Sequence, residues 1–564
     1  TPDMVELDGQ GRVGNTHSYS TRFRGTIPAP PPGVFASQVV EPVSYELEDG
    51  TTEVESGYMR RTATGNISFF NGRGWLIERR DRNGNRLRFI RDRFDLLKRV
   101  IDTQGREYVF EYESRKVQNV EHNLIVAITD VTGGRTCRYE YDDNLDLVAA
   151  TSFEGRREEY VYSGGGLDFA LRHNMLQVRR PNEVASGQGP YVVNIYDTVP
   201  NSPNKDRVVQ QLLGGSVQIP DLNARNGEQM LVQAGGIFEF SYASAAVVNT
   251  RSRLDTLNSA FSITTVKDRR GGTTVFTFSA FGNPITHRDE AGHQIRYAYD
   301  EDGLQRSVTY PNGQSEFFGY DKKATFSFNR GNMVYHLRLP GGDSDEPGVL
   351  TGFEYEPLFN QVTRITETQG FQQVFGPPSL EEDAVEWLES QRSSDFERFS
   401  TLTFYDYQEG SGPLDPSEAK FGIDQTLVEE LVERGLGDLN LDGRVSRVRG
   451  NPVAFRKHLV TQPELQEIWT RISYNDWGLP ERIIDAEGST RAVTYHPSGY
   501  THETVEDPDG FALKTVGLYN DLGLLEESVD ARGNRTVYEY DKDGLVKQIH
   551  KAANDSSVGF RIRY

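Results

Sequence analysis

The sequence predicts a mainly β fold, in which antiparallel β-hairpin repeats of about 21 residues spiral into a hollow shell or barrel-like superstructure, with a small helical insertion. Three observations predict this fold. One turn motif returns at a fixed interval. Aromatic and β-branched residues fill the stretches between the turns, as strands prefer. Apolar residues make up 36% of the chain, with a mean hydropathy of -0.60, which indicates a thin wall rather than a solid core.

The repeat is clearest between residues 268 and 321. Asp268 and Gly271 frame a turn that returns 21 residues later as Asp289 and Gly292. In such a turn the aspartate can accept a local backbone N–H, and the glycine tolerates a positive φ. Aromatic residues two apart, as in Tyr-x-Tyr, point to the same face of a strand. The residues predicted to carry the repeat are Asp268, Gly271, Asp289, Gly292, Tyr297, Tyr299, Asp300, Gly303, Tyr320, Asp321, Tyr538, Tyr540, Asp541 and Gly544.

Each repeat reads as two short strands and two turns, and a long series of them has to curl because strands twist and open edges invite aggregation. The chain divides into four predicted parts. Residues 1–35 form an extended, proline-rich segment, and residues 36–374 form a repeat array that degenerates at 163–260. Residues 375–470 form a helical insertion, and residues 471–564 return to the array.

Helix-capping signals predict the insertion. Ser379 is a credible N-cap for a helix that runs through Glu389, and Thr426 opens a second capping box. Pro452 and Pro463 are each suited to the first turn of a further short helix.

The insertion also contains a candidate metal loop. Asp438, Asn440 and Asp442 place oxygens at positions 1, 3 and 5 of a pattern that resembles the calcium loop of EF-hands and dockerins. Arg444 would donate its backbone carbonyl to the ion, and Ser446 could hold a water. Position 12 should be acidic and is an arginine, so the alternative is an Asp/Asn/Gly turn without an ion. Calcium is the only cofactor that the sequence suggests.

The motif Tyr-x-Tyr-Asp-x-x-Gly-Leu at 297–304 and 538–545 resembles the YD-repeat, or Rhs, family. That family includes Rhs polymorphic toxins, the shell-forming components of insecticidal toxin complexes, and teneurin ectodomains. The resemblance implies a continuous β-sheet that spirals into a hollow shell and can enclose a toxin segment, in a secreted or cell-surface protein. The self-cleaving core segment of Rhs proteins has no match here, so no catalytic residue is carried over.

Charge and composition narrow the range of functions that the chain could have. The net charge of -22 argues against nucleic acid as a partner and suits cations or a basic guest. No apolar run is long enough to span a membrane. The sequence therefore predicts a non-catalytic shell segment that encloses or presents a protein cargo or further segments of its own polypeptide. The alternatives are an extracellular adhesion or carbohydrate-binding module that takes glycans, and a structural protein that self-associates into a filament or tube.

Overall fold

One antiparallel sheet dominates the computed structural model of the chain. The structure describes residues 36–62, 66–164, 171–220, 229–233, 235–245, 252–324, 330–342, 346, 348–356, 360–367, 383–391, 400–405, 450–459, 466–551 and 560–563. Within these residues, 35 strands form a single sheet, and β15 and β16 form a separate two-stranded ribbon. Nearly every strand of the large sheet pairs with the next strand along the chain, which confirms the predicted mainly β fold of antiparallel hairpins.

The elements up to residue 258 begin with a regular series and then become irregular. They are β1 (Ala36–Glu46), β2 (Thr52–Thr62), β3 (Ile67–Phe70), β4 (Leu76–Arg80), β5 (Arg86–Arg91), β6 (Leu97–Ile101), β7 (Glu107–Val117), β8 (Val120–Asp130), β9 (Arg135–Tyr141), β10 (Leu147–Thr151), β11 (Arg157–Tyr162), β12 (Met175–Arg179), α1 (Pro181–Ser186), β13 (Val192–Tyr196), β14 (Val208–Leu213), β15 (Ser216–Pro220), β16 (Gln229–Gln233), β17 (Gly236–Ser244) and α2 (Arg253–Asn258).

The later elements continue the same sheet. They are β18 (Ser262–Lys267), β19 (Thr273–Phe278), β20 (Pro284–Arg288), β21 (Gln294–Tyr299), β22 (Gln305–Thr309), β23 (Ser315–Asp321), β24 (Asn332–Leu339), β25 (Val349–Tyr355), β26 (Val362–Glu367), α3 (Ala384–Gln391), β27 (Ser400–Tyr405), β28 (Pro452–Leu459), β29 (Gln466–Tyr474), β30 (Pro480–Ile484), β31 (Thr490–Tyr495), β32 (Thr501–Glu506), β33 (Leu513–Tyr519), β34 (Leu525–Val529), β35 (Arg535–Tyr540), β36 (Val546–Lys551) and β37 (Phe560–Arg563).

The turn between β21 and β22 shows how the sequence makes a hairpin. The Asp300 carboxylate accepts the N–H groups of Asp302 at 2.9 Å and Leu304 at 3.0 Å. Gly303 donates its N–H to the Asp300 carbonyl at 3.1 Å and has a φ of 84°. Just before the turn, the pairing register shifts at Tyr299, which marks a β-bulge. Bulges increase the local twist of a sheet, so repeated bulges favour a curved wall.

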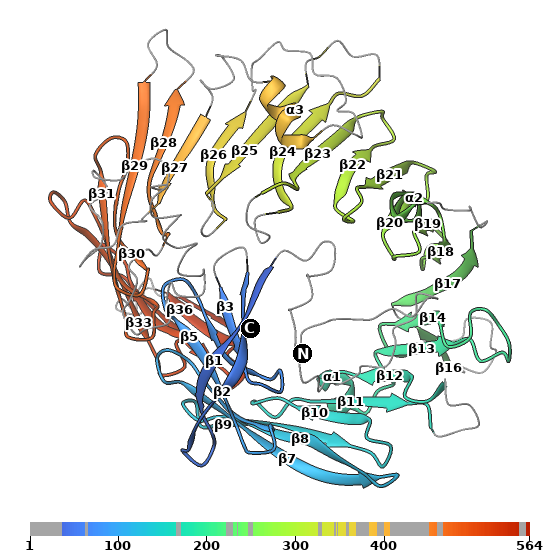
Figure 1. The fold of residues 1–564 in the computed structure, drawn as a ribbon. Helices are drawn as coiled ribbons and strands as arrows, with labels where there is room; N and C mark the ends of the chain where they lie inside the picture. Colours follow the sequence, from blue (N-terminus) through green and yellow to red (C-terminus); the bar gives the residue numbers. More distant parts are fainter. Residues whose placement is uncertain are drawn as a thin grey trace.

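The sheet bends round on itself. Figure 1 shows the strands following one another round a ring, so that the last strands, in red, lie beside the first, in blue. Buried apolar side chains form small separate clusters along this ring rather than one core. One cluster joins β1 to β4 through Val43, Met59, Ile67, Phe69 and Ile77. The ring is therefore a wall about one sheet thick over most of its course.

The range 375–470 differs from the predicted helical insertion. The described helix there, α3, is capped by Asp383, which accepts the Val385 N–H at 3.0 Å. The helix predicted at Pro452 is wrong, because Pro452 begins β28, which pairs with both β27 and β29. A proline is tolerated at the first residue of a strand as well as at the first turn of a helix. Ser379, Thr426 and Pro463 lie outside the described residues.

Candidate functional site: the seam between the first and last arrays

Two sets of turns meet where the ring closes. We call this contact the seam and define it by the turns 81–85, 102–106, 130–135 and 152–156 of the first array and the turns 475–479, 496–500, 520–524 and 541–545 of the last. Hydrogen bonds across it join residues between 385 and 407 positions apart in the chain. The turns also approach closely, since a Cβ on Gly133 would come within 2.4 Å of the Leu522 Cδ2. The seam thus fastens one end of the wall to the other.

Asp543 is the main acceptor in the seam. Its carboxylate accepts the Ser152 hydroxyl at 2.8 Å, the Glu154 N–H at 2.9 Å and the Arg156 Nη1 at 2.9 Å. Arg156 also pairs with Asp541, whose side chain is 1% exposed. Because three donors of one turn bind the same carboxylate, they fix the orientation of that turn relative to the last array as well as the distance between the two turns.

Glu154 makes the reciprocal contact from the other side of the seam. Its carboxylate accepts the Lys542 N–H at 2.6 Å and the Lys547 Nζ at 3.1 Å, and these two donors hold the pKa of Glu154 below its usual value. At Asp541, burial opposes ionisation, but the Leu545 N–H and the Arg156 guanidinium outweigh burial and hold the pKa of this carboxyl below its usual value. The contact is therefore built from groups that are charged at neutral pH.

In each turn of the first array, the residue after the turn glycine lies at the contact with the last array, and in three of the four turns it donates across the seam. Asn85 donates to the Trp477 carbonyl at 3.4 Å, Arg135 donates to the Lys542 carbonyl at 2.5 Å, and Arg156 pairs with Asp541. Arg106 in the remaining turn lies close enough to Tyr500 of the last array to interact with it electrostatically. Outside the seam, the same position in the corresponding turns is occupied by Gly272, His293, Gln314, Ser489 and Asn534. Arginine at this position is the signal that could have located the seam from sequence.

The predicted repeat residues have structural contacts at the ends of the strands. Tyr299, Tyr320 and Tyr540 each donate the phenol hydroxyl at 2.8 Å to a carbonyl 15 residues earlier. Burial is the main cause that raises the pKa of Tyr299 and Tyr320 to about 12. Tyr297 and Tyr538 lie within β21 and β35, opposite Val308 and Ile549.

The aspartates and glycines of the repeat form the turns. The carboxylates of Asp268, Asp289, Asp300, Asp321 and Asp541 each accept at least one nearby backbone N–H. Gly271, Gly292, Gly303 and Gly544 all have φ between 84° and 88°. Asp541 and Gly544 lie in the seam, and the other predicted repeat residues lie in or near the rest of the wall.

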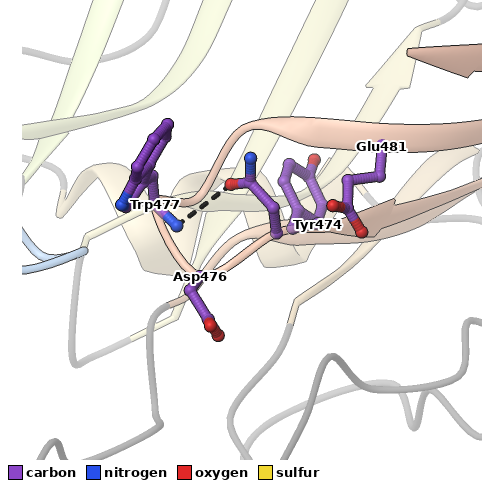
Figure 2. Close-up of a pocket in the computed structure, with 5 residues that line it drawn as sticks. Tyr474, Asp476, Trp477 and Glu481 are labelled. Atoms are coloured by element: carbon purple, nitrogen blue, oxygen red, sulfur yellow. Dashed lines mark hydrogen bonds between the residues drawn. The ribbon is translucent and has the colours of Figure 1, made fainter. Parts of the chain in front are cut away.

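A hollow of about 380 Å³ lies at the turn 475–479, the first turn that the last array contributes to the seam (Figure 2). Tyr474, Asn475, Asp476, Trp477 and Glu481 line it. The turn that carries them is well fixed, because the Asn475 side chain accepts the backbone N–H groups of Trp477 at 3.0 Å and of Leu479 at 2.9 Å. The backbone of Trp477 is held in this turn, and 40% of the residue is exposed.

The candidate calcium ligands Asp438, Asn440, Asp442, Arg444 and Ser446 lie outside the described residues, so calcium binding stays a prediction. Among the described residues, no three His, Cys, Asp or Glu side chains come together in a way that could hold a metal ion. The described helices are all too short or too polar to cross a membrane.

Fold and seam together define a self-closing wall of β-hairpins. Residues 278–315 match the family model described as RHS repeat, which confirms the predicted repeat family for this stretch. No curated protein sequence matches the chain.

Two solved structures are similar over most of this chain. The Photorhabdus luminescens Tc holotoxin pore carrying a TccC3 mutation is 12% identical, with a TM-score of 0.43, and the match covers 93% of this chain and 22% of the other. The TcdB2-TccC3-TEV structure is 10% identical, with a TM-score of 0.30, and the match covers 100% and 28%. The chain thus spans less than a third of either.

Proposed function

We propose that this chain is a non-catalytic YD-repeat wall segment of a secreted or surface Rhs-type protein, and that its wall encloses or presents another polypeptide. The seam is the observation that carries this proposal. A sheet of 35 strands whose last turns are fastened to its first turns makes a closed circuit. The match of residues 278–315 to the RHS repeat supports the same assignment.

A structural role for the motif residues supports the non-catalytic part of the proposal. The tyrosine hydroxyls donate to backbone carbonyls, as Tyr299 does to Pro284. The turn aspartates accept backbone N–H groups, as Asp268 does from Arg270 and Gly272 at 2.8 Å. These polar groups hold strands and turns together, so the role of the repeated residues is to stabilise the wall.

Protection of a guest polypeptide tests the proposal. An unfolded, protease-sensitive reporter would be joined after Tyr564, and its cleavage would be compared with that of the same fusion carrying Arg156→Ala and Asp543→Ala. We expect cleavage to be about tenfold slower when the seam is intact, because digestion then depends on how often the wall opens. Equal cleavage rates in the two fusions, with both walls shown to be folded by circular dichroism, would contradict enclosure. Consistent hits on a glycan array, or polymers in mass photometry, would favour the adhesion or the self-assembly alternative.

A further inference from the structure

Five consecutive strands of the wall contain no acidic residue. They are β18 to β22, which follow one another along the green part of the ring in Figure 1. Their sequences contain four lysines or arginines and no aspartate or glutamate. The whole chain, by contrast, has 83 acidic residues and 61 lysines and arginines. The faces of these strands are therefore locally basic in an acidic protein.

Two arginines of this region are neighbours on one face of the sheet, and we call them the arginine pair. Where β20 pairs with β21, Thr286 is opposite Arg296, and Arg288 is opposite Gln294. Arg288 and Arg296 are thus diagonal neighbours on the same face, with Cβ atoms roughly 7–8 Å apart. Both arginines are exposed. Thr309 on β22 lies opposite Arg296 on its other side, so uncharged polar side chains surround the pair.

Within the part of the chain that the structure describes, neither guanidinium of the arginine pair has a hydrogen bond or an ion pair. The acids of the adjoining turn are in other contacts. The Asp289 carboxylate accepts the His293 N–H at 2.8 Å. The Glu290 carboxylate lies where a Cβ on Gly272 would be. The arginine pair therefore presents two sets of unused donors to the solvent.

Other strand pairs of the wall show which group a cation takes on a sheet face. Lys267 pairs at 2.9 Å with Glu239, which lies directly opposite on the neighbouring strand. Arg535 donates at 2.7 Å to Glu527, which is its diagonal neighbour. At the arginine pair, the diagonal neighbour of each arginine is the other arginine. This pattern indicates a carboxylate from another molecule or segment as the partner of each guanidinium.

We propose that the arginine pair binds two carboxylates of an acidic polypeptide segment in extended conformation. Alternate side chains of an extended chain point to one side at intervals of roughly 6.4–6.8 Å, which is close to the spacing of the pair. A guanidinium holds a carboxylate through two parallel N–H···O bonds. A segment with acids at positions i and i+2 therefore fits the pair. A nucleic acid fits less well, because many phosphates would meet a wall whose net charge is -22.

This binding goes beyond the enclosing function and does not depend on it. The arginine pair lies on two adjacent strands that are held by their own hydrogen bonds. A wall opened at the seam would present the pair as a closed wall does. A failure of enclosure would therefore leave the binding of acidic segments intact, and a failure of binding would leave enclosure intact.

Titration of the whole chain with two isomeric peptides tests the proposal. The probe is Thr-Glu-Thr-Glu-Thr, blocked at both ends and labelled with an uncharged fluorophore, and fluorescence anisotropy at low ionic strength gives its Kd. The control peptide Thr-Thr-Glu-Glu-Thr has the same charge but points its two acids to opposite sides when extended. We expect the probe to bind about threefold to tenfold more tightly than the control. Equal affinities, or displacement of the probe by an equimolar amount of inorganic phosphate, would overturn the proposal.

Matched charge changes locate the contact on the wall. In Arg288→Gln with Arg296→Gln, we expect the probe to bind about threefold to thirtyfold more weakly, because two exposed ion pairs are lost. Arg138→Gln with Arg532→Gln is the control, since it removes the same charge from two exposed arginines on β9 and in the turn 530–534. This control should leave the affinity unchanged. Equal weakening in both double variants, with folding shown by circular dichroism, would overturn the proposal.

Discussion

A single tyrosine hydroxyl links neighbouring strands in the clear repeats. Tyr299, Tyr320 and Tyr540 each reach a carbonyl 15 residues earlier, at the first residue of the preceding strand. The tyrosine lies where a bulge shifts the register with the following strand, and the bond gives its largely buried hydroxyl an acceptor on the preceding strand. This contact explains why the second tyrosine of the motif recurs with the turn that follows it.

The hydroxyl of Tyr299 sets an upper limit to the pH range over which the wall is fully stable. Burial raises the pKa of Tyr299 to about 12, whereas an exposed tyrosine titrates near 10. Between these values the unfolded chain has lost the proton that the folded chain keeps, so stability is full below about pH 10 and falls as pH rises towards 12. We expect the absorbance of tyrosinate at 295 nm to rise together with unfolding over this range. Tyr299→Phe should remove one step of the titration, and a wall whose tyrosines all titrate near pH 10 while folded would contradict this.

The turn glycine Gly271 is required by its backbone conformation alone. Gly271 has a φ of 87°, and a Cβ built on it meets nothing within 4 Å. Gly271→Ala should therefore cost about 1–2 kcal/mol through the left-handed backbone without any steric clash. We expect hydrogen exchange at the β18–β19 hairpin to speed up by a factor of about 5–30. Gly271→Asn is the control and should cost less, because asparagine adopts this conformation more readily; equal costs would point to a cause other than φ.

At the scale of elements, α3 covers a part of the wall that would otherwise expose apolar side chains. Leu337 and Leu350 on β24 and β25 are 0% exposed, and Trp387 and Leu388 of the helix join them in one cluster. The Trp387 ring lies 4.5 Å from that of Tyr335. The helix thus replaces the missing second layer at one place on the ring.

Removal of the indole from α3 should detach the helix from the sheet. We expect Trp387→Ala to lower the free energy of unfolding of this region by about 3–5 kcal/mol, the usual cost of a large buried aromatic residue. Glu386→Ala is the control, because its side chain is 75% exposed and its pair with Lys323 is worth less than about 1 kcal/mol. Hydrogen exchange of the backbone amides of β24 measures the loss of stability in both variants. Similar protection in the two variants would show that α3 does not stabilise the strand.

The regular part of the fold could be predicted from local sequence. A turn such as Asp268 to Gly271 is determined by its own residues, and the strands between turns follow from their aromatic and β-branched composition. The helix predicted at Pro452 is wrong because a proline fits both the first turn of a helix and the start of a strand. Only the pairing of β28 with β27 and β29 decides between the two, and that pairing depends on segments far away in the chain.

At the scale of the whole molecule, the seam could not be predicted by spacing. Which turn of the first array meets which turn of the last depends on the accumulated twist and bulging of the strands between them. Arginine at the residue after the turn glycine, as at Arg135 and Arg156, is a local signal of the seam, but nothing in its own repeat identifies the partner. The acceptors, such as Asp543, look in sequence like any other turn acid.

The charged contact at Arg156 and Asp543 should decide whether the ring stays closed. We expect Arg156→Ala and Asp543→Ala each to open the seam, seen as a larger radius of gyration in small-angle X-ray scattering. The double variant should be little worse than either single variant, because the two residues share one contact. Arg491→Ala is the control, since its pair with Glu506 lies within one hairpin. Equal expansion in the control would contradict a specific role for the seam.

Acid should open the same contact. Asp541 keeps its charge below the usual pKa of an aspartate because the Leu545 N–H and Arg156 outweigh the effect of burial. Its contribution to stability is therefore full above about pH 4 and is lost as pH falls towards the lowered pKa of the folded state. Glu154, held by the Lys542 N–H and Lys547, changes in the same direction. Scattering between pH 7 and 3 should show expansion in the native chain and little further change in Arg156→Ala, which is already open; an unchanged radius in the native chain would show that other contacts hold the ring.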